Sequence, residues 1–176
     1  MVDAYASPND LEMEVDEPAN FRFRDWNRVD FNWITDRVAV GGISYDDATF
    51  RKLAKAGFTH VIDCTHREFH RIARGLKAVG IKYLNAYTGD DGQTKDIDWF
   101  APIVEFGLAA LDDPNTRLLA HCAAGYNRGP SAGYAILRAQ GMSIEDAYYG
   151  MKQRRFVGIA YALDAEIALR KLGYVA

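Results

Sequence analysis

Short apolar runs alternate along the chain with longer segments in which apolar residues recur every three or four positions. The runs have the length and composition of buried strands, which we expect at 36–42, 59–64, 81–86 and 116–122. The longer segments have helical spacing, and we expect helices within 46–57, 67–80, 96–113, 131–140, 143–155 and 160–172. Strands that alternate with helices predict an α/β domain with a central, mostly parallel sheet flanked by helices.

The first thirty residues differ in character from the rest of the chain. Residues 1–20 carry no Lys or Arg but several acidic side chains: Asp3, Asp10, Glu12, Glu14, Asp16 and Glu17. Such a stretch is typical of a flexible arm, so we expect an acidic arm over residues 1–30 and the folded, catalytic domain over 31–176. Aromatic and polar residues alternate at the start of 21–34, which predicts a strand that pairs onto a sheet edge.

Composition narrows the class of protein. A chain of 176 residues, 49% of them apolar, can bury one core, so we expect one domain. The net charge of −3 disfavours nucleic acid and anionic membranes as partners. No apolar run approaches the ~20 residues that span a bilayer, and the acidic start lacks a signal-peptide core, so we expect a cytoplasmic protein. We also expect a monomer. Cys64, His66 and His70 lie close in sequence without a convincing fourth ligand, so no metal site is expected.

The segment HCAAGYNRGPS (121–131) joins the last expected strand to the helix after it. A thiol at the start of a helix experiences the helix dipole and unpaired amides, and both favour a nucleophilic thiolate at Cys122. The planar guanidinium of Arg128 can bind two oxygens of an oxyanion, and Gly125 allows close approach of the backbone. We therefore expect a phosphate cradle formed by Ala123, Ala124, Gly125, Tyr126, Asn127 and Arg128.

Phosphoester cleavage also needs a proton for the departing oxygen, and the loop contains no carboxylic acid. The segment YTGDDGQTKD (87–96) follows the strand expected at 81–86, so it reaches the same edge of the sheet. Asp90 and Asp91 are both candidates for the general acid on this spacing. The chemistry of a cysteine, an arginine and an aspartate requires no metal or cofactor.

The loop, in which five residues separate a His-Cys pair from Arg, resembles the signature of the cysteine-dependent protein tyrosine phosphatases. Its Ala-Gly pair is similar to the dual-specificity branch, and the resemblance extends over residues 33–172. The segments CTHRE and DDGQTKDI are similar to those of the kinase-associated and regenerating-liver phosphatases. The resemblance implies a dual-specificity-phosphatase-like fold, Cys122 as the nucleophile and Asp91, directly before Gly92, as the acid.

The same resemblance implies a function. We expect hydrolysis of phosphotyrosine, and as a further option phosphoserine or phosphothreonine, on phosphoproteins or phosphopeptides through a phosphocysteine intermediate. Two alternatives stay open. One is a pseudophosphatase that binds phosphate without turnover, and the other is a rhodanese-type sulfurtransferase, which also places a cysteine in an anion-binding loop.

Residues around the loop add further expectations. The family usually has Ser or Thr at the position of Gly129, so we expect slow hydrolysis of the phosphoenzyme, with Ser131 as a candidate substitute on a different helix face. His121 is expected to bond the loop backbone and tune the thiolate. In the two relatives named above a cysteine matching Cys64 forms a reversible disulfide with the nucleophile; the alternative is a buried free thiol. Arg155 matches a basic position that contacts phosphate groups in some relatives, but we expect it instead as a solvated charge at a helix end.

Overall fold

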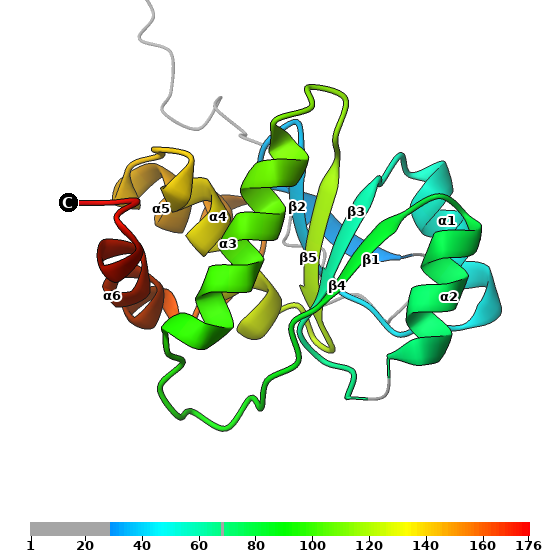
Figure 1. Ribbon diagram of the computed structural model, residues 1–176, viewed down its shortest axis with the longest axis horizontal. Coiled ribbons are helices and arrows are strands. Elements are labelled where there is room, and N and C mark those ends of the chain that lie inside the picture. The colour runs from blue at the N-terminus through cyan, green and yellow to red at the C-terminus, as the bar shows by residue number, and fades with distance from the viewer. Residues whose placement is uncertain (1–28, 68) are drawn as a thin grey trace, which may run out of the picture.

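The computed structural model describes residues 29–67 and 69–176, which contain a five-stranded sheet (Figure 1). The strands are β1 (Asp30–Trp33), β2 (Val38–Gly42), β3 (His60–Asp63), β4 (Lys82–Asn85) and β5 (Leu118–Cys122). They lie in the order β1-β2-β5-β3-β4. Strand β1 runs antiparallel to β2 and the other neighbours are parallel, so the predicted, mostly parallel sheet is confirmed.

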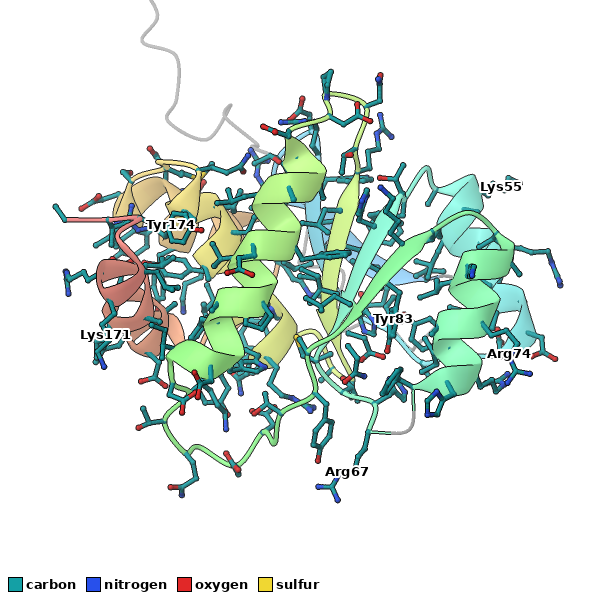
Figure 2. All side chains as sticks on the ribbon, viewed as in Figure 1. Lys55, Arg67, Arg74, Tyr83, Lys171 and Tyr174 are labelled. Carbon is teal, nitrogen blue, oxygen red and sulfur yellow. The ribbon has the colours of Figure 1, made fainter. Side chains whose placement is uncertain are left out.

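Helices cover both faces of the sheet. They are α1 (Asp47–Lys55), α2 (His70–Ala78), α3 (Ile97–Leu111), α4 (Arg128–Ala139), α5 (Ile144–Arg154) and α6 (Ala162–Leu172). Helices α1 and α2 lie on one face and α3 to α6 on the other, each over its own buried apolar cluster (Figure 1). Figure 2 shows side chains filling both layers, whereas Lys55 and Lys171 project from the periphery. None of the helices in the described part of the chain is long and apolar enough to cross a membrane.

Strand β1 forms one edge of the sheet. It pairs with β2 from Asp30 to Trp33, which confirms the predicted edge pairing for the end of the 21–34 stretch. Residues 21–28, where aromatic and polar residues alternate, lie outside the described residues. The rings of Phe31 and Trp33 pack on Phe58, with centroids 4.8 and 4.9 Å away, which fixes the strand over the α1 side of the core. The predicted acidic arm lies outside the described residues as far as position 28, whereas Asp30 belongs to β1.

Helix α4 begins at Arg128, three residues before the predicted start at position 131. The amide of Ser131 donates to the carbonyl of Asn127 at 2.8 Å and closes the first turn. Pro130 fits there because the first amides of a helix have no intrahelical partner. The earlier start places Arg128 and the preceding loop directly at the helix N-terminus, where the dipole favours an anion.

The central strand carries the functional loop. Strand β5 ends at Cys122, and its parallel neighbours β2 and β3 end beside it, with Gly42 opposite Cys122 and Asp63 opposite His121. Ligands of open α/β sheets bind beyond the carboxyl ends of the strands. The fold therefore presents the loop at the edge where the sequence placed it.

Candidate active site

Residues 121–128 form a tight loop whose carbonyl groups are held from outside. The carbonyl of Cys122 accepts a hydrogen bond from the Ile43 amide at 2.9 Å, and that of Tyr126 accepts one from the Gly158 amide at 3.0 Å. In a trans peptide the following amide points away from the carbonyl. The bonds therefore turn the amides of Ala123 and Asn127 toward the inside of the loop, where they can bind an oxyanion.

Gly125 is required by this geometry. Its φ of +65° lies in the left-handed region that side chains rarely adopt. A Cβ there would also lie 2.5 Å from the backbone of Gly41 and Gly42, and closer still to the guanidinium of Arg155. The loop can therefore pack against the end of β2 only with glycine at this position, as the sequence indicated.

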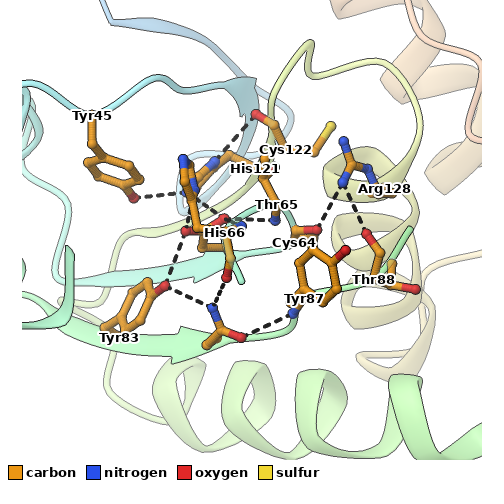
Figure 3. Close-up of polar contacts among 12 residues, drawn as sticks. Tyr45, Cys64, Thr65, His66, Tyr83, Tyr87, Thr88, His121, Cys122 and Arg128 are labelled. Carbon is orange, nitrogen blue, oxygen red and sulfur yellow. Dashed lines mark hydrogen bonds and ion pairs between the residues drawn. The ribbon is translucent and has the colours of Figure 1, made fainter. Parts of the chain in front are cut away.

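The guanidinium of Arg128 is hydrogen-bonded through Nη1 and has an unpaired donor at Nε. Its Nη1 donates to the carbonyls of Thr88 at 3.0 Å and Cys64 at 3.3 Å (Figure 3). Its Nε is buried and makes no hydrogen bond with the described residues; it lies 3.6 Å from Asp90 Oδ2, an ion-pair distance. A buried, unsatisfied cationic donor at a helix N-terminus is a site prepared for an anion.

His121 directly precedes Cys122 and is fully buried. Its Nδ1 is 3.4 Å from the Cys122 carbonyl, an acceptor, so Nδ1 carries the proton and Nε2 accepts from the Tyr45 hydroxyl at 2.8 Å (Figure 3). Burial lowers the pKa of His121 to about 4, so the imidazole is neutral at pH 7. The contact of His121 with the loop backbone agrees with the sequence-based expectation, and its tuning of the thiolate stays a prediction.

Asp63 organises the polar groups beneath His121. This buried carboxylate accepts from His66 Nδ1 at 2.8 Å and from the Tyr83 hydroxyl at 3.1 Å, and it lies 3.8 Å from Nε2 of His121. Sequence reasoning did not select Asp63 or Tyr45. The one available signal was a charged residue inside the otherwise apolar run VIDC, since a buried carboxylate needs several donors around it.

The two candidate acids point in different directions. Asp90 faces the loop: its carboxylate accepts from the Tyr161 hydroxyl at 3.1 Å and from Asn127 Nδ2 at 3.4 Å. Asp91 turns away and forms an ion pair of 2.7 Å with Lys95, whose ammonium group lowers the pKa of the Asp91 carboxyl. The structure thus brings Asp90, and not the side chain of Asp91, up to the loop.

The two residues expected to affect thiolate departure lie on the first turn of α4. A Cβ at Gly129 would lie 2.6 Å from the carbonyl carbon of His121, so glycine lets the helix press against β5. Ser131 is fully buried, and its hydroxyl oxygen accepts from the Tyr161 amide at 3.2 Å. That contact directs Ser131 toward the α6 side, and a role in thiolate departure stays a prediction.

Cys64 directly follows β3 and lies beside Cys122. Its amide donates to the His121 carbonyl at 2.9 Å, which extends the strand pairing by one residue. Both Cys64 and Cys122 are buried free thiols, and burial is the main cause that raises the pKa of Cys64. Among the described residues no group of His, Cys, Asp and Glu could hold a metal ion; His66 instead bonds Asp63.

Arg155 is not the solvated helix-end charge expected from the sequence. Its side chain is 1% exposed and forms an ion pair with Asp30 at 2.7 Å. It also donates from Nε to the carbonyl of Gly125 at 3.0 Å. The expectation was wrong because the partner comes from β1, far away in sequence, and supplies the countercharge that makes burial of a guanidinium tolerable.

Comparison with known proteins identifies relatives of this chain. Dual specificity protein phosphatase 26 of Bos taurus is 30% identical over 87 residues, 49% of this chain and 41% of that protein. Dual specificity protein phosphatase 13B of Homo sapiens is 27% identical over 118 residues, 65% of this chain and 59% of that protein. The chain thus spans about half the length of the curated relatives it matches.

Solved structures share the fold. Human DUSP28 superposes with a TM-score of 0.65 at 18% identity, covering 81% of this chain and 95% of that one. PTPMT1 in complex with PI(5)P gives a TM-score of 0.66 at 17% identity, covering 83% and 99%. The family model described as the dual specificity phosphatase catalytic domain matches residues 43–162, more than half of the chain. The chain therefore belongs to the dual specificity phosphatase family.

Proposed function

We propose that the protein hydrolyses phosphotyrosine on proteins through a phosphocysteine intermediate. The observation that carries this proposal is the unsatisfied Nε of Arg128, which sits at the N-terminus of α4 beside Cys122. One nucleophile, one open guanidinium edge and inward-turned amides form a binding site for a phosphoryl group next to sulfur. Family membership supports the same chemistry.

The reaction needs two displacements at phosphorus. In the first, Sγ of Cys122 forms a bond to phosphorus while the bond to the leaving oxygen breaks, and that oxygen takes a proton from an aspartic acid. Arg128 and the loop amides hold the equatorial oxygens as charge develops on them. In the second, water attacks phosphorus, the sulfur–phosphorus bond breaks, and the aspartate takes the proton of the water.

Asp90 is the better candidate for that acid in this structure. It lies 3.6 Å from Arg128 Nε, the atom expected to bind phosphate. A phosphoryl group bound by Arg128 would therefore lie beside the Asp90 carboxyl group. Asp91 is held ionised by Lys95 and is half-exposed, so it is poorly prepared to donate a proton. The resemblance implied Asp91, so the two assignments differ.

The rim of the loop favours a protein substrate. Tyr126 is 39% exposed, and its ring lies 5.4 Å from that of Phe156. These two rings present an apolar surface on which a substrate tyrosine can pack. One structural relative holds the phosphoinositide PI(5)P, but here Tyr126 and Asn127 bring no positive charge to the loop. Phosphoinositide headgroups would need such charge.

Hydrolysis of a phosphotyrosine peptide, compared with that of p-nitrophenyl phosphate, tests the function and the acid together. We expect metal-independent, vanadate-sensitive turnover by the unmodified protein. Asp90→Asn is expected to lower kcat for the peptide about 100-fold, and Asp91→Asn less than about threefold. The loss should be smaller for p-nitrophenyl phosphate, because p-nitrophenolate departs without a proton.

Other outcomes would change these assignments. If Asp91→Asn lowers kcat more than Asp90→Asn does, Asp91 is the general acid. The loop at 89–92 must then rearrange to bring its carboxyl group to the substrate. Absence of turnover, together with binding of inorganic phosphate, would indicate a phosphate-binding pseudophosphatase. The glycine at position 129, where the family usually provides a hydroxyl, is the feature that favours this second function.

Cys64 is proposed as a reversible protective partner of the nucleophile. Neighbouring strands lie about 4.8 Å apart, which falls within the range of Cα separations, about 4.4–6.8 Å, that a disulfide spans. Peroxide would convert the Cys122 thiolate to a sulfenic acid, and the Cys64 thiol would displace water to form the disulfide.

The disulfide can be detected after brief treatment with peroxide. We expect the intact mass to fall by about 2 Da, with activity lost and then recovered in dithiothreitol. In Cys64→Ser the sulfenic acid has no partner thiol, so a second equivalent of peroxide should oxidise it to the sulfinic acid, a loss that dithiothreitol does not reverse. Equal recovery in both proteins would show that Cys64 is only a buried thiol.

A further inference from the structure

Arg155 connects the phosphate loop to the edge strand β1. Its five N–H groups all have acceptors: Nη1 donates to Asp30 Oδ1 and Asn32 Oδ1 at 2.8 Å, and Nη2 donates to Asp30 Oδ2 at 2.7 Å. The other two donors reach the loop, Nε to the Gly125 carbonyl at 3.0 Å and Nη2 to the Ala124 carbonyl at 3.4 Å. The guanidinium thus has no donor left for a substrate.

The two loop carbonyls that Arg155 binds determine where two amides point. The carbonyl of Ala124 belongs to the same peptide plane as the Gly125 amide, and that of Gly125 to the same plane as the Tyr126 amide. Holding both carbonyls toward Arg155 turns both amides the opposite way, into the loop. Arg155 therefore fixes two donors in addition to those of Ala123 and Asn127.

The β1 carboxylate holds the guanidinium in this position. Asp30 and Asn32 are two residues apart on a strand, so their side chains leave the same face and converge on Arg155. The bidentate pairing with Asp30 fixes the plane of the guanidinium as well as its location. The charge on Asp30 is therefore coupled, through one buried cation, to the orientation of the loop peptides.

We propose that Arg155, held by Asp30 and Asn32, is a positioning residue that sets the Gly125 and Tyr126 amides for the oxyanion. This assignment rests on the proposed function in so far as the loop binds a phosphoryl group. It makes β1 part of the active site although no β1 side chain reaches the substrate. Arg155 acts through the loop and touches no reacting atom.

The test compares charge-removing variants on the binding of an oxyanion and on turnover. Asp30→Asn and Arg155→Lys should each raise the vanadate inhibition constant and the KM for p-nitrophenyl phosphate about tenfold. The milder Asn32→Ala should shift both in the same direction. Asp47→Asn is the matched control, because it removes a carboxylate from an exposed 2.7 Å pair with Arg71 and should change neither value.

The design separates positioning from folding. Loss of folded protein lowers apparent kcat but leaves KM and the inhibition constant unchanged, whereas misaligned amides raise both. Lower melting temperatures with unchanged constants in all three variants would overturn the proposal. Binding of inorganic phosphate, followed by ³¹P NMR, distinguishes failure of the proposed hydrolysis from failure of the proposed role of Arg155. If the unmodified protein binds phosphate without turnover, hydrolysis is refuted, and the role of Arg155 can still be tested through the effect of the variants on phosphate binding. If it binds no phosphate, both proposals are overturned.

Discussion

Exchange of Cys122 for serine is expected to lower the turnover of aryl phosphates by about four to six orders of magnitude while phosphate binding persists. A serine hydroxyl is protonated at neutral pH and needs a base to become a nucleophile. The neighbouring His121 is not available as this base, because its Nδ1 faces the Cys122 carbonyl and its Nε2 bonds the Tyr45 hydroxyl. The proposed anion site consists of Arg128 and backbone groups, which the exchange leaves in place.

Steady-state kinetics and ³¹P NMR would measure the two parts of this expectation. Cys64→Ser is the matched control, because it exchanges the neighbouring buried thiol, and it should retain activity within about threefold under reducing conditions. Comparable turnover in Cys122→Ser and the unmodified protein would exclude a phosphocysteine intermediate. Loss of phosphate binding together with turnover would instead mean that the sulfur contributes to the anion site.

Arg128→Ala is expected to lower kcat/KM roughly 10³-fold or more and, in contrast to Cys122→Ser, to abolish phosphate binding as well. The guanidinium provides both the open Nε donor and the charge opposite the phosphoryl oxygens. Arg128→Lys should recover little, because an ammonium cannot make the anchoring bonds to Thr88 and Cys64 and also bind two phosphate oxygens.

Arg71→Lys makes the same conservative exchange at an exposed site, where the side chain pairs with Asp47, and serves as the control. Its kinetic constants should match those of the unmodified protein. Near-normal activity of Arg128→Lys would show that charge alone, without the planar guanidinium, binds the phosphoryl group. For Arg128→Ala, isothermal calorimetry with inorganic phosphate would show whether the lost activity reflects lost binding or a slower chemical step.

The sequence was sufficient for the sheet and for the loop because both depend on local pattern. Runs such as LLAHC are buried on both sides and have the pattern of strands, and the strand–loop–helix order places Cys122 at the sheet edge. The start of α4 was missed because Gly129 and Pro130 disfavour the interior of a helix. In the first turn they cost little, and Gly129 allows close contact with β5.

The environment of Arg155 and the directions of Asp90 and Asp91 could not be predicted from the sequence, because they depend on contacts between distant segments. Arg155 looked like a solvated charge because Asp30, its partner, lies on an edge strand across the fold. Asp90 and Asp91 are adjacent in sequence, and only the path of the loop decides which carboxylate faces Arg128 and which pairs with Lys95. A sequence pattern carries no information on such side-chain directions.

The pairing of Asp30 with Arg155 also defines where the domain can be trimmed. A shortened protein beginning at residue 31, the boundary suggested by composition, would keep most of β1 but discard the carboxylate. Arg155 would then remain buried against the loop without its countercharge. The smallest portion of the chain that preserves the loop therefore starts no later than Asp30, and any tag or fusion is best attached upstream of it.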